Sequence, residues 1–149
     1  MSTVLKAFCG LCLLAIGLFG ADSPFVGTWK MNAAKSKLEG SGIDANAVVH
    51  VEQDGGGLKV SVEAKPSSYT YQAALDGKAT KVTGSPVIDE IATQAIKERE
   101  MSARGLKGGL IVYVDLRIVS RDGKTMTITR NGSNPEGKPF KATLVLDKQ

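Results

Sequence analysis

The stretch that decides the fold reads Phe-Val-Gly-Thr-Trp-Lys at residues 25–30. It holds the only tryptophan of the chain, Trp29, two residues after Gly27. Apolar and polar residues begin to alternate here, as they do in a β-strand with one buried face. We therefore interpret this segment as the first strand. The chain that follows shows short strands and tight turns.

The segment before this strand is typical of a secretory signal. Lys6 gives it a positive start, residues 7–19 are apolar apart from glycines, and small residues follow at Gly20 and Ala21. We predict cleavage after Gly20, with cleavage after Ala21 or an uncleaved anchor as alternatives. The apolar run is short for a membrane span. The predicted organisation is a signal peptide at 1–20 and one domain at 21–149, secreted or periplasmic, with no integral membrane span after cleavage.

Composition argues against several functional classes. Both cysteines, Cys9 and Cys12, lie in the predicted signal, so the mature chain would have no disulfide. The net charge of +4 is mild and the basic residues are scattered, which argues against a nucleic-acid partner. His50 is the only histidine, so we expect no metal site and no cofactor. No nucleophile, base and orienting group can be assembled, so we expect no catalytic residues and no enzyme. A monomer is assumed.

Turns rich in glycine separate the predicted strands. The Asp-Gly pair at 122–123 gives the most clearly predicted hairpin, and the Asp-Gly-Gly-Gly run at 54–57 gives another. Residues 33–46 break the alternation and are predicted to form a loop over one end of the fold. The predicted strands outside 86–104 are residues 25–30, 47–52, 58–63, 69–75, 79–83, 110–121, 124–130 and 140–146.

Residues 86–104 are ambiguous. Read alone, their apolar spacing favours a helix, with Pro86 in its first turn and Gly105 at its end. Between hairpins, two short strands fit better, because an antiparallel meander is hard to close across an inserted helix. We predict an all-β protein, an antiparallel up-and-down barrel of about eight to ten strands, with a short helix in 86–104 as the alternative.

The opening stretch resembles the first strand of the lipocalin and fatty-acid-binding protein group, which carries Gly-x-Trp at this place. The whole pattern is similar to that of small exported lipocalin-like proteins of bacteria. The resemblance implies a calycin-type barrel in which Gly27 and Trp29 form a plug at the closed end. The Arg-x-Tyr that anchors a carboxylate in the fatty-acid-binding branch is missing from the last strand here. For the late arginine that lipocalins pack over the tryptophan, Arg130 or Lys148 is the candidate. The matching pieces are residues 27–30, 34–36, 76–78, 84–86, 120–125 and 147–149.

Candidate ligand-binding residues come from the predicted inner faces of the strands. Arg130 shares parity with Met126 and Ile128, so it would point inward and could bind an anionic head group. The alternative is an exposed arginine at a strand end. Tyr69 and Tyr71 would either line a cavity or belong to an apolar core. The predicted ligand-binding set is Tyr69, Tyr71, Val112, Val114, Met126, Arg130 and Leu144.

Two functions from different classes fit these residues. The first is an exported binding protein that holds a small hydrophobic or amphipathic ligand in a barrel cavity. The alternative is a structural or protein-interaction module of the cell envelope. Its barrel would be filled by its own side chains and its exposed patch would include Ile111 and Tyr113.

Overall fold

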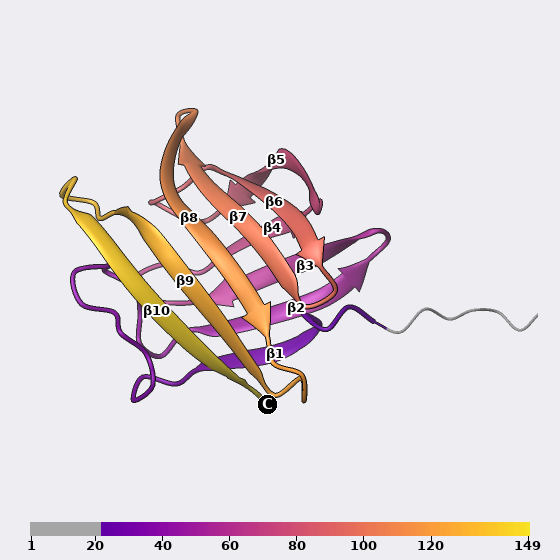
Figure 1. The fold of residues 1–149 in the computed structure, drawn as a ribbon. Helices are drawn as coiled ribbons and strands as arrows, with labels where there is room; N and C mark the ends of the chain where they lie inside the picture. The colour runs from indigo at the N-terminus through magenta and orange to yellow at the C-terminus, as the bar shows by residue number, and fades with distance from the viewer. Residues whose placement is uncertain (1–21) are drawn as a thin grey trace, which may run out of the picture.

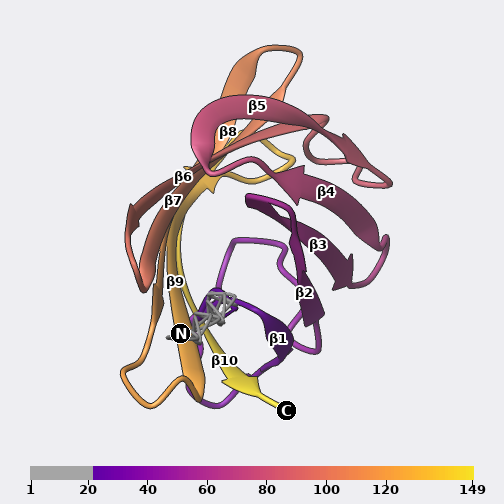
Figure 2. The ribbon, with the colours of Figure 1, turned by 90° about the vertical axis from the view of Figure 1, so that its right-hand side faces the viewer.

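The computed structural model describes residues 22–149, so the predicted signal peptide at 1–20 and both cysteines lie outside the described residues. Ten antiparallel strands close into one barrel, in which each strand pairs with its sequence neighbours and the first pairs with the last (Figure 1). Figure 2 shows the strands curving around a single interior. The all-β barrel prediction is confirmed. The strands are β1 (Gly27–Met31), β2 (Val48–Asp54), β3 (Gly57–Glu63), β4 (Tyr69–Ala73), β5 (Asp76–Thr83), β6 (Glu90–Lys97), β7 (Glu100–Lys107), β8 (Leu110–Val119), β9 (Thr125–Ser133) and β10 (Pro139–Lys148).

The ambiguous segment forms two strands, β6 and β7, joined by a tight turn at Glu98 and Arg99. Ile91 and Thr93 are buried, and Ala103, the partner of Thr93, is buried beside them. Ladder pairing with β5 and β7 thus replaces the helical stripe that the segment shows when read alone, and β7 shows the period-two burial of a strand. Residues 22–149 contain no helix, and so none that is long and apolar enough to cross a membrane.

Hairpin connectivity gives the barrel two different ends. Connections that follow odd-numbered strands lie at one end, and those that follow even-numbered strands lie at the other, because successive strands run in opposite directions. The long connection between β1 and β2 contains the predicted loop at 33–46. Lys37 in this loop pairs with Thr143, so the loop continues the ladder beside β10 where β1 has ended.

The end opposite that loop is plugged by Trp29, which is completely buried. Its Nε1 donates a hydrogen bond of 2.9 Å to the carbonyl oxygen of Phe25, and Lys148 Nζ lies 5.4 Å from the ring centre. Lys148 rather than Arg130 therefore packs over the tryptophan. Gly27 has φ +141°, and a Cβ there would lie 2.6 Å from Lys148 Cε. The Gly-x-Trp spacing thus leaves room for a cation over the indole.

We expect Gly27→Ala to lower the free energy of unfolding by about 1–3 kcal/mol, because alanine rarely adopts this backbone conformation. The measurement is urea denaturation followed by tryptophan fluorescence. Gly56→Ala is the matched control, since a Cβ at Gly56 meets nothing within 4 Å. Equal midpoints for the two variants would contradict this account of Gly27.

Candidate ligand-binding site

The barrel encloses a cavity of about 190 Å³. Its wall is mostly aliphatic and thioether, with Val60, Met101, Met126, Ile128 and Leu144 among the lining residues. The lining extends to residues 41–44, 64–67 and 85–88, in three connections that all follow odd-numbered strands. A ligand would therefore reach the interior from that end, because Trp29 and Phe25 fill the other.

A charged cluster lies inside this otherwise apolar space. Asp115 of β8 is 1% exposed and accepts hydrogen bonds from two arginines. Arg130 Nε donates to Oδ1 at 2.7 Å and Arg130 Nη2 to Oδ2 at 2.8 Å, a bidentate pair. Arg117 donates to Oδ2 from Nε at 3.2 Å and from Nη2 at 2.9 Å. Both guanidinium groups line the cavity, and the carboxylate lies behind them.

Three tyrosines complete the cluster. Arg117 Nη1 donates a 2.8 Å hydrogen bond to the hydroxyl oxygen of Tyr71, whose ring stacks on that of Tyr69 with centroids 6.4 Å apart. The guanidinium carbon of Arg130 lies 3.7 Å from the ring centre of Tyr113. These aromatic contacts fix both arginines in position, and so preorganise the cationic side of the cavity.

The cluster carries one unbalanced positive charge. Burial alone would raise the pKa of Asp115, but the charges and hydrogen bonds of Arg130 and Arg117 outweigh burial and lower that pKa below its usual value. Asp115 is therefore ionised, and both arginines stay protonated. Burial raises the pKa of Tyr69 and of Tyr113, so both phenols are neutral. Two cations face one anion in a space of low dielectric constant.

Donors in this cluster remain available to a ligand. Arg130 Nη1 has no hydrogen-bond partner among residues 22–149, although the other two nitrogens of that guanidinium do. The hydroxyl of Tyr71 accepts from Arg117, which leaves its own hydrogen free to donate. Chemically, the arrangement can bind a small group with one negative charge.

Most of the predicted ligand-binding residues line the cavity, namely Tyr69, Tyr71, Val112, Met126, Arg130 and Leu144. Val114 does not, since its side chain lies on the outside of the barrel and is 43% exposed. Tyr113, predicted in an exposed patch, is instead buried inside, whereas its predicted companion Ile111 is exposed.

A β-bulge explains these differences. Gly105 pairs with Tyr113 and Leu106 with Ile111, so Val112 is an extra residue in β8. Strict alternation from Val112 would place Val114 inside, but the extra residue shifts the parity by one. Tyr113, Asp115, Arg117 and Val119 therefore face the interior. The apolar residues Val114, Leu116 and Ile118 face solvent.

Sequence reasoning missed Asp115 and Arg117, the centre of the cluster. The signal lay in glycines on the neighbouring strands. A Cβ at Gly105 would lie 2.6 Å from the ring of Tyr113, and one at Gly132 would lie 2.6 Å from Tyr113 Cβ. Glycine inside a strand marks such close approach, and here it marks where the ring of Tyr113 turns inward.

The remaining candidates lie outside the site. His50 is on the outer surface, where its Nε2 lies 2.9 Å from Glu63 Oε1 and its Nδ1 lies 3.1 Å from the hydroxyl of Thr28. Within the described chain, no three His, Cys, Asp or Glu residues gather in a way that could hold a metal ion.

Fold and site together define a closed antiparallel β-barrel with a small apolar cavity and a buried cationic cluster. Among solved structures, the chain is similar to one described as REP1-NXSQ fatty acid transporter, with a TM-score of 0.57 and 12% sequence identity. The match covers 83% of this chain and 95% of the transporter chain, so the two share a fold. No family model and no curated protein matches this sequence.

We expect Asp115→Asn to lower the free energy of unfolding by roughly 3–5 kcal/mol near neutral pH, because it leaves two buried arginines without a counter-charge. The folded-state pKa of Asp115 is lowered, so its contribution is present above the unfolded value near about 4 and is lost as pH falls through the folded value. Urea titrations at several pH values test both points.

The difference between wild type and Asp115→Asn should shrink as the pH falls below about 4. The control is Asp54→Asn, which removes a carboxylate from the exposed end of β2. A pH-independent difference at Asp115 would contradict the ionised cluster.

Proposed function

We propose that the protein binds a small amphipathic anion inside its barrel, with the apolar part of the ligand among the aliphatic side chains and its single charge at Arg130. The observation that carries this proposal is the Nη1 of Arg130, which has no hydrogen-bond partner within the described part of the chain and belongs to a cluster with one surplus positive charge. A singly charged head group would balance the cluster, and an uncharged ligand would leave it unbalanced.

The size of the cavity favours a short ligand. A volume of about 190 Å³ is below the 300 to 1,000 Å³ or so that is usual for drug-sized ligands. The similarity in fold to a fatty acid transporter supports a hydrophobic ligand and leaves its length open. We therefore propose a ligand with a short alkyl or compact apolar body and one acidic group.

The chemistry of the cluster supports binding rather than catalysis. Burial raises the pKa of Asp115, but Arg130 and Arg117 outweigh burial and hold that pKa below its usual value, which makes this carboxylate a weak general base. The phenols of Tyr69 and Tyr113 are held neutral by burial. An internal cavity also favours a binding protein over the alternative of an envelope module with a filled barrel.

We further propose that this binding takes place outside the cytoplasm, on the basis of the signal-like residues 1–20. A native mass spectrum of the protein purified gently from its own host tests this together with the ligand. We expect a chain that begins at Ala21 and carries a small acidic molecule that is lost on mild denaturation. A chain that still begins at Met1 would contradict export with cleavage.

Octanoate and 1-octanol form a matched pair of probes, since they share a chain length and differ in charge. We expect the protein to bind octanoate more tightly in isothermal titration calorimetry. Arg130→Gln should weaken octanoate roughly 10- to 100-fold, as expected for the loss of a hydrogen bond to a charged group. The binding of 1-octanol should change little. The remaining pair of Asp115 and Arg117 is electrically balanced, so this variant should still fold.

Lys59→Gln is the control, because it removes a positive charge from the exposed outer face of β3 without touching the cavity. If Arg130→Gln and Lys59→Gln bind octanoate equally well, the role of Arg130 as head-group site is wrong.

A further inference from the structure

The outer surface of β8 carries an unusual concentration of exposed apolar side chains. Leu110, Ile111, Val114, Leu116 and Ile118 account for five of the seven large hydrophobic residues that are exposed within 22–149. Val114, Leu116 and Ile118 alternate along the strand and are 43%, 37% and 42% exposed. They face solvent because Asp115 and Arg117 occupy the inward positions between them.

On the side of β9 and β10, the rows of Leu116 and Ile118 extend this surface without charge, whereas the row of Val114 continues through Asn131 to the exposed Lys141. Leu116 pairs with Thr129 of β9, which pairs with Thr143 of β10, while Ile118 pairs with Thr127, which pairs with Val145. By contrast, the outer face of β3 carries Lys59, Ser61 and Glu63. We define the β8 face as the outward side chains of Val114, Leu116, Ile118, Thr127, Thr129, Thr143 and Val145.

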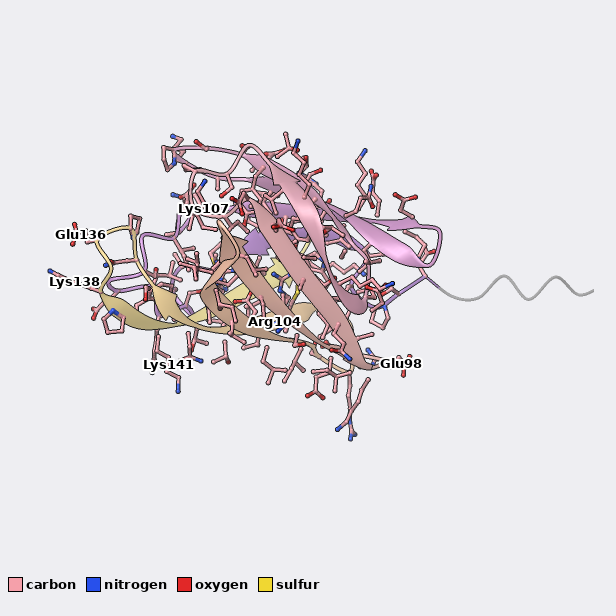
Figure 3. The ribbon with its side chains drawn as sticks, turned by 90° about the horizontal axis from the view of Figure 1, so that it is seen from above. Glu98, Arg104, Lys107, Glu136, Lys138 and Lys141 are labelled. Carbon is pink, nitrogen blue, oxygen red and sulfur yellow. The ribbon has the colours of Figure 1, made fainter. Side chains whose placement is uncertain are left out.

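Charges border the β8 face in a particular order. On β7, Arg104 pairs with Val114 and Glu100 pairs with Ile118, so opposite charges flank the two ends of the apolar row. Figure 3 shows Glu98 at the end opposite Lys107 and Lys141, with Arg104 between them, and it shows Glu136 at the same end as Lys141. Glu100 contacts Lys97 at 3.8 Å, an exposed pair of little strength.

We propose that the β8 face is the interface of a homodimer in which two copies pack sheet against sheet. A two-fold axis that lies between the sheets, perpendicular to the strands and over Leu116, reverses the order of positions along β8 and β7. It places Val114 against Ile118 of the second copy and Arg104 against Glu100 of the second copy, twice by symmetry. The charges of this one chain therefore complement themselves.

The chemistry of the surface suits such packing. Short branched side chains on a twisted sheet interdigitate at the spacing of about 10 Å that is usual between packed sheets. The central Leu116 would lose its contact with water, while the Arg104 and Glu100 pairs at the rim would select the orientation.

Sedimentation equilibrium of the purified protein tests the proposal. We expect a dimer for the wild type, and for Leu116→Glu a dissociation constant raised by roughly 100-fold or more, because an unpaired charge would be buried. Thr70→Glu is the control, since it adds the same charge to an exposed position on β4 and should stay dimeric. Thermal unfolding verifies that each variant folds. A monomeric wild type, or a Leu116→Glu variant that remains a dimer, overturns the proposal.

Charge exchange tests the symmetry itself. Arg104→Glu should weaken the dimer by about tenfold or more, because it sets two pairs of like charges against each other. Adding Glu100→Arg to that variant should restore association. In a homodimer each substitution is present on both facing surfaces, so the introduced Glu at 104 again faces an Arg at 100 of the second copy. A double variant no tighter than Arg104→Glu alone overturns the two-fold arrangement.

Discussion

The buried carboxylate of Asp115 is the interaction on which the rest of the interior depends. Removing a carboxylate from water is costly, and two arginines with four hydrogen bonds offset the cost. In return, the carboxylate holds the guanidinium group of Arg130 over the ring of Tyr113 and that of Arg117 against the hydroxyl of Tyr71. The same residue determines which side of β8 is inside. An inward Asp115 requires an outward Leu116, so the buried charged cluster and the apolar outer face of β8 have one cause.

The two ends of the barrel use different means to control access. At one end, the fully buried Trp29 is packed beneath Lys148 and hydrogen-bonded to Phe25. At the other, the cavity wall continues into loops held by local hydrogen bonds, such as that of Ser41 with Leu38, and by one from the Lys65 N–H to Asp44 that joins two of these loops. Loops of this kind open at lower free energy than a packed core does. The cavity is thus closed at the Trp29 end by a packed core and bordered at the other end by loops that open more easily.

The fold could be predicted from the sequence because alternation and glycine turns act locally. The Asp-Gly turn at 122–123 and the inward side of Met126 and Arg130 follow from a few neighbouring residues. The cluster could not be predicted in the same way. Its centre depends on the extra residue at Val112, and a bulge is visible only when the register of β7 against β8 is known. The sequence could not decide between Arg130 and Lys148 as the cation over Trp29 for a similar reason. The contact of Lys148 with Trp29 joins residues from opposite ends of the domain.

Up-and-down topology makes the last strand the one that completes the structure. Nine of the ten strand pairs join neighbours in sequence, and only β1 with β10 joins distant segments. A chain still missing its C-terminal residues has an open sheet with two free edges, an exposed indole at Trp29 and no cation above it. Closure is therefore a single late event, since it carries the largest loop entropy of any pairing. Without β10, β1 has only β2 as a partner, and the barrel cannot close around its cavity.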